Sequence, residues 1–437
     1  MALREIPGTK GDLYSIISVS IFYLYFTREE AMKRKVIIVL IAVTITSIAA
    51  SEEKIQFTNT YNPRVFSYTL KKDESNIFSL LINSSEEEEK EAFEIDAKLC
   101  AAARYNSANL AKKGDVPKKL ETTALRPLLW SYGVYDFQYL PTAFIYKTEE
   151  SLKDSIKVFL HTISKRGFFN CGVGVSDFKD EKKIATIICS KRVIDTFDIP
   201  KIMNIGSYLN LEFKIRSGYK DPILYFSPPS GEVKKIAPAI SERGEFSYSY
   251  ELSGGDGKYL VQIITQGKNG VEAVFLIPIY VGVSLSDIKK EMLTYINIED
   301  NTKNVSVEVA RDMLLKAINY ERKKANLTPL KLNQKLCSIA LSKSKAMAEK
   351  QLFGHEIEQH KLEELLKSEN IQFNKASENI GLNSSPRMAH FLFMSSPAHR
   401  SNILNSMFSE VGIGIYKAGD EDAQWFITEI FLMPKEL

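Results

Sequence analysis

Two neighbouring segments near the C-terminus decide the fold: Ser-Pro-Ala-His-Arg-Ser-Asn-Ile-Leu at residues 396–404 and Val-Gly-Ile-Gly-Ile at residues 411–415. The second segment alternates between β-branched apolar residues and glycine, and a polar turn and an apolar run at residues 425–431 follow it, which predicts two antiparallel β-strands. A Cys-Gly-Val-Gly-Val segment at residues 171–175 repeats the first strand at a shift of 240 residues. Glycine at alternate positions indicates close packing of these strands.

A helical segment also occurs twice. Residues 93–113 and 330–350 align at a shift of 237 with seven identities, including a shared Lys-Leu-Cys. In both copies the apolar and small residues recur at helical spacing and form one buried stripe. Asp96 and Asn333 precede the two stripes and are expected to cap the helices. The repeats predict a duplicated α+β unit.

The region between the two copies has a different pattern. Short alternating runs separated by glycine and proline turns extend over residues 208–281, which predicts an all-β, immunoglobulin-like sandwich at residues 205–284. The flanking α+β copies are expected at residues 51–195 and 300–437. The predicted fold class is therefore α+β with an inserted β-sandwich. Several domains are expected because a chain of 437 residues is too long for one hydrophobic core.

The pattern near the N-terminus is typical of an export signal, with an uncleaved membrane anchor as the alternative. A basic cluster and an apolar run occupy residues 32–50, and small residues at their end suit cleavage, which predicts a signal peptide. Residues 1–31 are then expected to be a spurious, untranslated extension in front of the true start at Met32. No later run is long enough to span a bilayer, so a secreted protein, extracellular or periplasmic, without a stable transmembrane span is expected.

Composition and charge exclude several classes of protein. Apolar residues make up 44% and charged residues 25% of the chain, as in globular proteins. With 57 basic and 54 acidic side chains, the net charge of +3 does not suggest a nucleic-acid binder. Four cysteines are too few for a disulfide-dense scaffold.

Most of the histidines gather in the second α+β copy, four of the five lying in the last 83 residues. The motifs found there are Phe-Gly-His at 353–355, Ser-Glu-Asn-Ile at 377–380, and the two segments quoted first. In this order they closely resemble the CAP superfamily (cysteine-rich secretory proteins, antigen 5 and pathogenesis-related proteins), in its bacterial secreted form. The resemblance covers about residues 306–434.

The resemblance implies an α-β-α sandwich with a cleft in which two histidines and two acids hold a divalent cation. His355 and His399 take the histidine positions, and Glu378 takes that of the acid in the Glu-Asn-Ile motif. In the fuller family pattern a second acid precedes the second histidine, but residues 393–396 read Phe-Met-Ser-Ser here. This sequence therefore lacks one of the four expected ligands.

Two imidazoles and one carboxylate suit zinc or a similar divalent cation. Such an ion would acidify a bound water, and Glu378 is then the candidate base that takes its proton. The alternative is that Glu378 and His399 are polar residues that fasten the loops of the cleft. A zinc-protease motif is excluded, because His355 and His360 are five residues apart and lie on different faces of a helix.

The first copy lacks the corresponding histidines and the Glu-Asn motif, so it resembles a degenerate CAP-like domain. Cys171 and Cys189 lie symmetrically about the predicted turn; a disulfide and two buried thiols are both compatible with their positions. Cys100 and Cys337 fall on the buried helical stripes and are expected in the core.

Three functions follow from these observations. The first is an exported protein whose C-terminal cleft binds an extracellular ligand, a lipid-like or cell-envelope molecule, with or without a divalent cation. The second is a cation-assisted hydrolase or protease that uses His355, Glu378 and His399. The third is a non-catalytic surface scaffold. Binding is favoured because the missing acid weakens the case for an enzyme.

Overall fold

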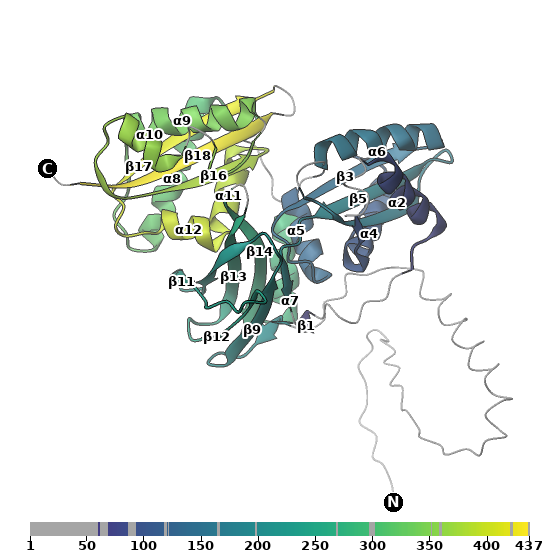
Figure 1. The fold of residues 1–437 in the computed structure, drawn as a ribbon, viewed down its shortest axis with the longest axis horizontal. Helices are drawn as coiled ribbons and strands as arrows, with labels where there is room; N and C mark the ends of the chain where they lie inside the picture. The colour runs from purple at the N-terminus through teal and green to yellow at the C-terminus, as the bar shows by residue number, and fades with distance from the viewer. Residues whose placement is uncertain are drawn as a thin grey trace, which may run out of the picture. The chain divides into compact units, whose positions relative to one another are not determined.

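The structure is a computed structural model. It describes residues 60–61, 69–85, 93–117, 120, 122–163, 167–196, 199–267, 270–296, 302–350, 352–357, 361–419 and 423–435. The predicted N-terminal extension, the predicted signal peptide and His360 lie outside these residues. We refer to residues 69–190, 193–283 and 302–435 as the N-terminal, central and C-terminal modules (Figure 1).

The C-terminal module has one four-stranded sheet between two layers of helices. The sheet order is β15 (Lys331–Leu332), β17 (Glu410–Ala418), β18 (Gln424–Pro434) and β16 (Phe373–Asn383). The helices are α8 (Val307–Lys324), α9 (Gln334–Glu349), α10 (Leu362–Ser368), α11 (Pro386–Met394) and α12 (Pro397–Ile403). Because successive strand residues face opposite sides, Ile430 packs under α9 while Phe431 joins the core under α8.

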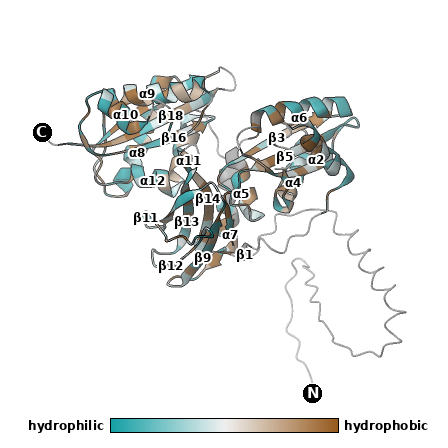
Figure 2. Cartoon of the chain, in the orientation of Figure 1, coloured by the Kyte–Doolittle hydropathy of each residue, from teal (hydrophilic) through white to brown (hydrophobic). Residues whose placement is uncertain are grey.

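The N-terminal module has the same strand order. Its sheet runs β2 (Glu94–Ile95), β4 (Asn170–Asp177), β5 (Lys183–Ser190) and β3 (Tyr139–Tyr146). Its helices are α2 (Lys72–Ser84), α4 (Ala97–Lys113), α5 (Thr122–Ser131) and α6 (Glu149–Ile163). In both sheets the first pair of strands is parallel and the other two pairs are antiparallel. Figure 2 shows hydrophilic and hydrophobic residues on α6 and α9, as expected for helices with one buried face.

The same glycines let a helix approach the sheet in both modules. A Cβ atom on Gly414 would lie 2.1 Å from the Ala340 carbonyl carbon of α9. A Cβ on Gly174 would lie 2.2 Å from the Ala103 carbonyl carbon of α4. The prediction of close packing is thus confirmed, but the close neighbour is the covering helix rather than another strand.

The predicted helix caps are also present. The Asp96 side chain accepts hydrogen bonds from the first amides of α4, and the Asn333 side chain does the same for α9. Satisfying these amides fixes where each helix begins. Cys100 and Cys337 are buried free thiols at equivalent positions on the two helices.

The central module consists of β-strands, and two sheets share its core. The larger sheet contains β11 (Lys234–Ile236), β10 (Lys220–Ser227), β13 (Gly257–Gly267), β14 (Gly270–Val281) and β8 (Ile202–Met203). The smaller contains β12 (Glu245–Glu251), β9 (Tyr208–Ile215) and β6 (Ile194–Thr196). Strand β7 (Ile199–Pro200), which lies between β6 and β8 in the chain, forms a short pair with β1 (Thr60–Tyr61), and α7 (Leu285–Ile296) follows β14. Along β9 exposed and buried residues alternate, so one face packs into the core.

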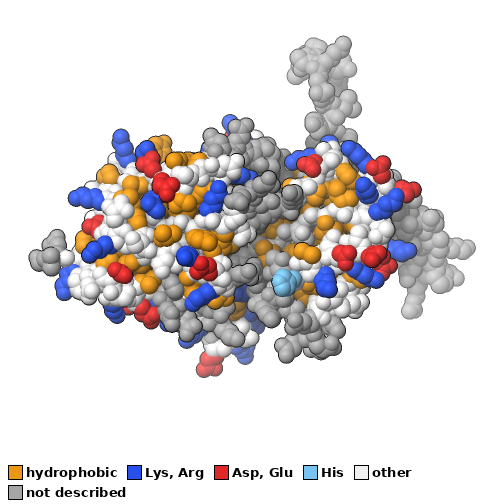
Figure 3. Space-filling view, turned by 90° about the horizontal axis from the view of Figure 1, so that it is seen from above, with side chains coloured by type: hydrophobic (Ala, Val, Ile, Leu, Met, Phe, Trp, Pro, Cys, Tyr) orange, Lys and Arg blue, Asp and Glu red, His pale blue; other side chains and the backbone are white. Residues whose placement is uncertain are grey.

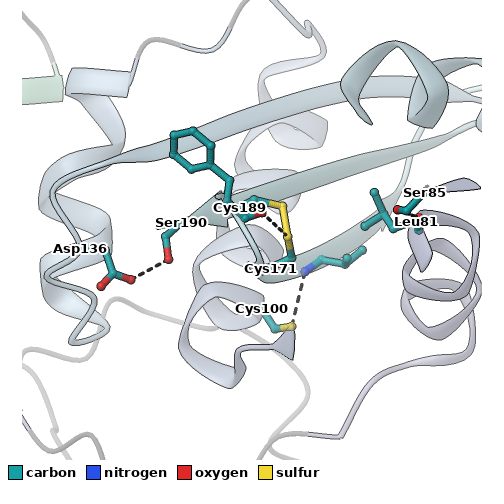
Figure 4. The surroundings of a disulfide bond; sticks show 9 residues. Leu81, Ser85, Cys100, Asp136, Cys171, Cys189 and Ser190 are labelled. Carbon is teal, nitrogen blue, oxygen red and sulfur yellow. Dashed lines mark hydrogen bonds between the residues drawn. A yellow bond between two sulfur atoms is a disulfide. The ribbon is translucent and has the colours of Figure 1, made fainter. Parts of the chain in front are cut away.

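Cys171 and Cys189 form a disulfide, which selects between the two alternatives left open by the sequence. They are direct partners in the antiparallel register of β4 and β5, with their Cα atoms 4.1 Å apart (Figure 4). Directly opposed residues of an antiparallel pair point to the same face of the sheet, so the two side chains meet there. The bond lies in the core under α2 and α6.

The surface has no dominant charge on the face drawn in Figure 3, where basic and acidic side chains are interspersed. Among the described helices, none is both long and apolar enough to cross a bilayer.

Candidate functional site

Glu378 and Asn379 lie on β16, an edge strand of the C-terminal sheet. Adjacent strand residues point to opposite faces, so the two side chains have different surroundings. Glu378 reaches the side covered by α9, where it meets Lys343 and His355. Asn379 reaches the other side, where it meets Glu429 and the backbone of α12.

Lys343 and His355 both bind the same oxygen of Glu378. The Lys343 Nζ atom lies 2.5 Å from Glu378 Oε1 and also donates to the His355 carbonyl oxygen at 2.7 Å. The His355 Nδ1 atom lies 2.8 Å from Glu378 Oε1. The Lys343 side chain is fully buried, Glu378 is 7% exposed and His355 is 31% exposed. Lys343 thus joins the loop that carries His355 to the strand that carries Glu378.

The position of Lys343 in the sequence predicts that its side chain is buried, although a charged residue is expected on the exposed face of a helix. Lys343 follows Ile339 by four residues and Ala340 by three, so it continues the buried stripe of α9. A lysine is seldom fully buried unless it is paired. A lysine on a buried stripe therefore predicts an acidic partner on the sheet, and Glu378 is that partner.

Glu378 is held in its charged form. Burial raises its pKa, but the hydrogen bond from His355 and the positive charge of Lys343 outweigh burial, so its pKa lies below 4.5. Its second oxygen, Oε2, is buried and receives no hydrogen bond from any described residue. A charged oxygen in this position is a strong acceptor without a donor.

His399 lies on α12. Its ring makes an edge-type contact with the ring of Phe393 on α11, and the two ring centroids are 5.1 Å apart. Burial and the nearby His355 lower the pKa of His399 to about 3. The imidazole is therefore neutral at physiological pH. In the fuller family pattern a second acid lies in the stretch that residues 393–396 occupy here. Phe393, the first of these residues, packs against His399.

A second polar network fixes α12 on the edge strand. Asn379 Nδ2 donates to the His399 carbonyl oxygen at 3.3 Å and to Glu429 Oε2 at 3.0 Å. Asn402 Nδ2 donates to Asn379 Oδ1 at 2.9 Å and to the Glu378 carbonyl oxygen at 3.3 Å. The Asn of the Glu-Asn-Ile motif and Asn402 of the quoted segment 396–404 are thus positioning residues.

Glu429 is fully buried in this network. Burial raises its pKa to about 8, and the hydrogen bond from Asn379 only partly offsets this effect. No sequence motif marked Glu429, because its burial depends on the sheet being covered by α11 and α12.

The start of α12 has a partner in the central module. Gln262 Oε1 accepts a hydrogen bond from Ser396 Oγ at 3.0 Å and another from the Ala398 amide at 2.8 Å. Gln262 is fully buried. It satisfies an amide that the first turn of the helix leaves without an intrahelical partner.

The structure thus brings His355 and Glu378 into direct contact and places His399 near enough to His355 for that residue to help lower the pKa of His399. The carboxylate of this group already pairs with an ammonium at Oε1. Among the described residues, no three His, Cys, Asp or Glu side chains surround one point as a metal requires. The residues present do not fit a divalent cation bound through Glu378 Oε1.

A cavity of about 250 Å³ lies away from this group, between the start of α4 and strand β6. Asp96, Asp136 and Arg192 line it, and Arg192 pairs with both acids at 2.7 and 3.2 Å. Because each acid already has its partner, the cavity is lined by a closed ion-pair network.

The model of the cysteine-rich secretory protein family, CAP, matches residues 315–431. The C-terminal module is a CAP domain. Over 124 residues the chain is 32% identical to the uncharacterized protein YkwD of Bacillus subtilis, covering 28% of this chain. The match spans 48%, about half, of the length of YkwD. The family resemblance noted in the sequence is thereby confirmed.

Solved structures give further similarities to parts of the chain. An outer surface protein from Borrelia burgdorferi is 18% identical, with coverage of 30% of this chain and 97% of that one and a TM-score of 0.28. An extracellular protein containing an SCP domain from Bacillus anthracis is 18% identical, with coverage of 55% and 85% and a TM-score of 0.27. A cysteine-rich secretory protein from Staphylococcus aureus is 16% identical, with coverage of 73% and 98% and a TM-score of 0.24.

Proposed function

We propose that this is an exported protein whose CAP domain binds an extracellular ligand, a lipid-like or cell-envelope molecule, at Glu378, His355 and His399. The observation that carries the proposal is the buried Glu378 Oε2, an acceptor with no donor among the described residues. A ligand hydroxyl or amide that donates to this oxygen would satisfy it. The disulfide between Cys171 and Cys189 supports export, because such bonds persist in oxidising compartments.

The protonation states favour binding over hydrolysis. A general base works best when its pKa lies near the operating pH. The pKa of Glu378 lies below 4.5 and that of His399 is about 3, so both are weak bases at pH 7. The hydrolase is therefore the second candidate, and the scaffold is the third.

The other modules complete the proposal. The common strand order, the glycine contacts and the helix caps support an N-terminal module that is a degenerate CAP-like copy. In the strand register Pro141 occupies the position that Glu378 has in the CAP domain, so this copy has no equivalent acceptor. The two packed sheets of the central module support an immunoglobulin-like spacer that also holds α12 through Gln262.

The test is a ligand panel on the full mature chain, purified without chelator. Monopalmitoylglycerol and a soluble peptidoglycan disaccharide serve as probes, and binding is followed by thermal denaturation and native mass spectrometry. At least one probe is expected to raise the melting temperature, because a ligand that binds only the folded state stabilises it. Glu378→Gln is expected to remove that shift.

His161→Ala is the matched control for His399→Ala, because His161 is exposed on α6 of the other module. The His161 variant should bind like the wild type, and the His399 variant should bind more weakly. Equal binding by both variants would contradict the proposed site. No shift with any probe, together with cleavage of one of them, would favour the hydrolase.

A further inference from the structure

We infer that Lys343 supplies, from within the protein, the positive charge that a divalent cation would bring to Glu378, so that the CAP domain takes up its ligand without a metal. The inference deepens the proposed function and rests on it for the existence of a ligand. The role of Lys343 itself is testable without one.

The geometry places the ammonium where a cation would be needed. Lys343 Nζ is 2.5 Å from Glu378 Oε1 and 2.7 Å from the His355 carbonyl oxygen. It therefore neutralises the acid and connects the His355 loop to β16, two tasks that a metal bound by both residues would perform. The side chain is fully buried, so solvent does not compete for the ammonium.

The same ammonium opposes a metal at the remaining donors. A cation bound at Glu378 Oε2 would lie within a few ångströms of Lys343 Nζ, because the two carboxylate oxygens share one carbon. Like charges at such separations repel strongly when burial limits screening by water. The position expected for a second acid, which would offset this repulsion, is near the apolar Phe393.

The chemistry of the ligand follows from the charge balance. The Lys343 ammonium and the Glu378 carboxylate cancel each other, so a charged ligand group buried beside them would have no partner. An uncharged group with an O–H or N–H is the match for Glu378 Oε2. The ligand class is therefore a neutral hydrogen-bond donor, such as a hydroxyl of a glycerol or a sugar.

The test measures zinc uptake by the full mature chain, using isothermal titration calorimetry with ZnCl₂ and metal analysis after dialysis. The wild type is expected to bind zinc at this site too weakly to retain it through dialysis, and its melting temperature should be the same in zinc and in EDTA. Lys343→Met and Lys343→Gln are expected to bind zinc on the order of 100-fold more tightly than the wild type, because the repelling charge is gone. The gain should disappear when His399→Ala is added.

Lys345→Met is the matched control, because Lys345 lies on the same helix, is exposed and pairs with Glu349 of that helix. This variant should behave like the wild type. Zinc uptake by the wild type that His399→Ala abolishes would overturn the inference, whether or not the Lys343 variants fold. Folded Lys343 variants that take up no zinc would also overturn it. Either of these zinc results would leave the proposed ligand binding unaffected. A ligand panel in which no probe binds would refute the proposed ligand binding but not the role of Lys343.

Discussion

Replacing Glu429 by glutamine is expected to stabilise the CAP domain at neutral pH and to leave it nearly unchanged in acid. Glu429 is fully buried, and its pKa is raised to about 8 from an ordinary value of 4.5. Below pH 4.5 both the folded and the unfolded chain carry the proton. Between pH 4.5 and 8 only the folded chain carries it, so unfolding releases a proton and stability falls as the pH rises.

The size of the effect follows from this difference. Each pH unit in the window costs about 1.4 kcal/mol, so the penalty at pH 7 is about 3 kcal/mol. Glutamine resembles the protonated acid in shape and charge, and its amide oxygen can accept the hydrogen bond from Asn379 Nδ2 that Glu429 accepts. The Glu429→Gln variant should therefore avoid the penalty without losing the contact.

Fluorescence-detected denaturation can follow the CAP domain alone. The chain has two tryptophans, and Trp425 is buried in this domain. In a Trp130→Phe background, urea unfolding at pH 5, 6, 7 and 8 should show a gap between Glu429→Gln and its parent that widens from less than about 1 to about 4 kcal/mol.

Glu349→Gln serves as the control, since Glu349 is exposed at the end of α9. Its gap to the parent should be small, because the side chain is exposed. A constant gap for Glu429→Gln between pH 5 and 8 would refute the reasoning, because it would mean that the acid has the same pKa in the folded and unfolded chain.

Three further outcomes test the packing. Gly414→Ala is expected to cost about 3 kcal/mol or more in urea unfolding, because its Cβ would lie 2.1 Å from the Ala340 carbonyl carbon; a cost near zero would contradict the close helix approach. Replacing Cys171 and Cys189 by alanine should cost about 3 kcal/mol, the loop-closure value for their separation of 18 residues, and thiol labelling of the unreduced, unfolded wild type should find both blocked. Arg322→Met should cost about 3 kcal/mol or more, because Arg322 is 1% exposed and donates to four backbone carbonyl oxygens; retention of the wild-type midpoint would show that water replaces those bonds.

The sequence predicted the features that depend on local pattern. The helical stripe, the caps at Asp96 and Asn333 and the alternate glycines are all present, because each is set by residues a few positions apart. His355 Nδ1 lies 2.8 Å from Glu378 Oε1 in the structure, and the role of these two residues stays a prediction.

What the sequence left open depends on distant partners. The ion pair of Lys343 with Glu378 joins residues 35 positions apart, and its existence depends on how α9 lies on the sheet. The raised pKa of Glu429 likewise results from cover by helices that follow β16 in the chain. The disulfide required the register of β4 and β5, which places Cys171 directly opposite Cys189, and a slip of one residue would have separated them.

The buried lysine has a consequence for how the chain avoids misassembly. The N-terminal and C-terminal sheets have the same strand order and the same glycine contacts, so a helix of one module could dock on the sheet of the other during folding. Such misassembly is a known failure of repeated domains. In the CAP sheet Gly412, Ile430 and Glu378 lie opposite one another on three adjacent strands. In the N-terminal sheet the same positions are taken by Gly172, Ile188 and Pro141. If α9 settled on the N-terminal sheet, its ammonium would be buried beside a proline ring instead of a carboxylate, at a cost that disfavours the swap. Lys343 thus favours docking of α9 on the sheet that carries Glu378 over docking on the similar N-terminal sheet.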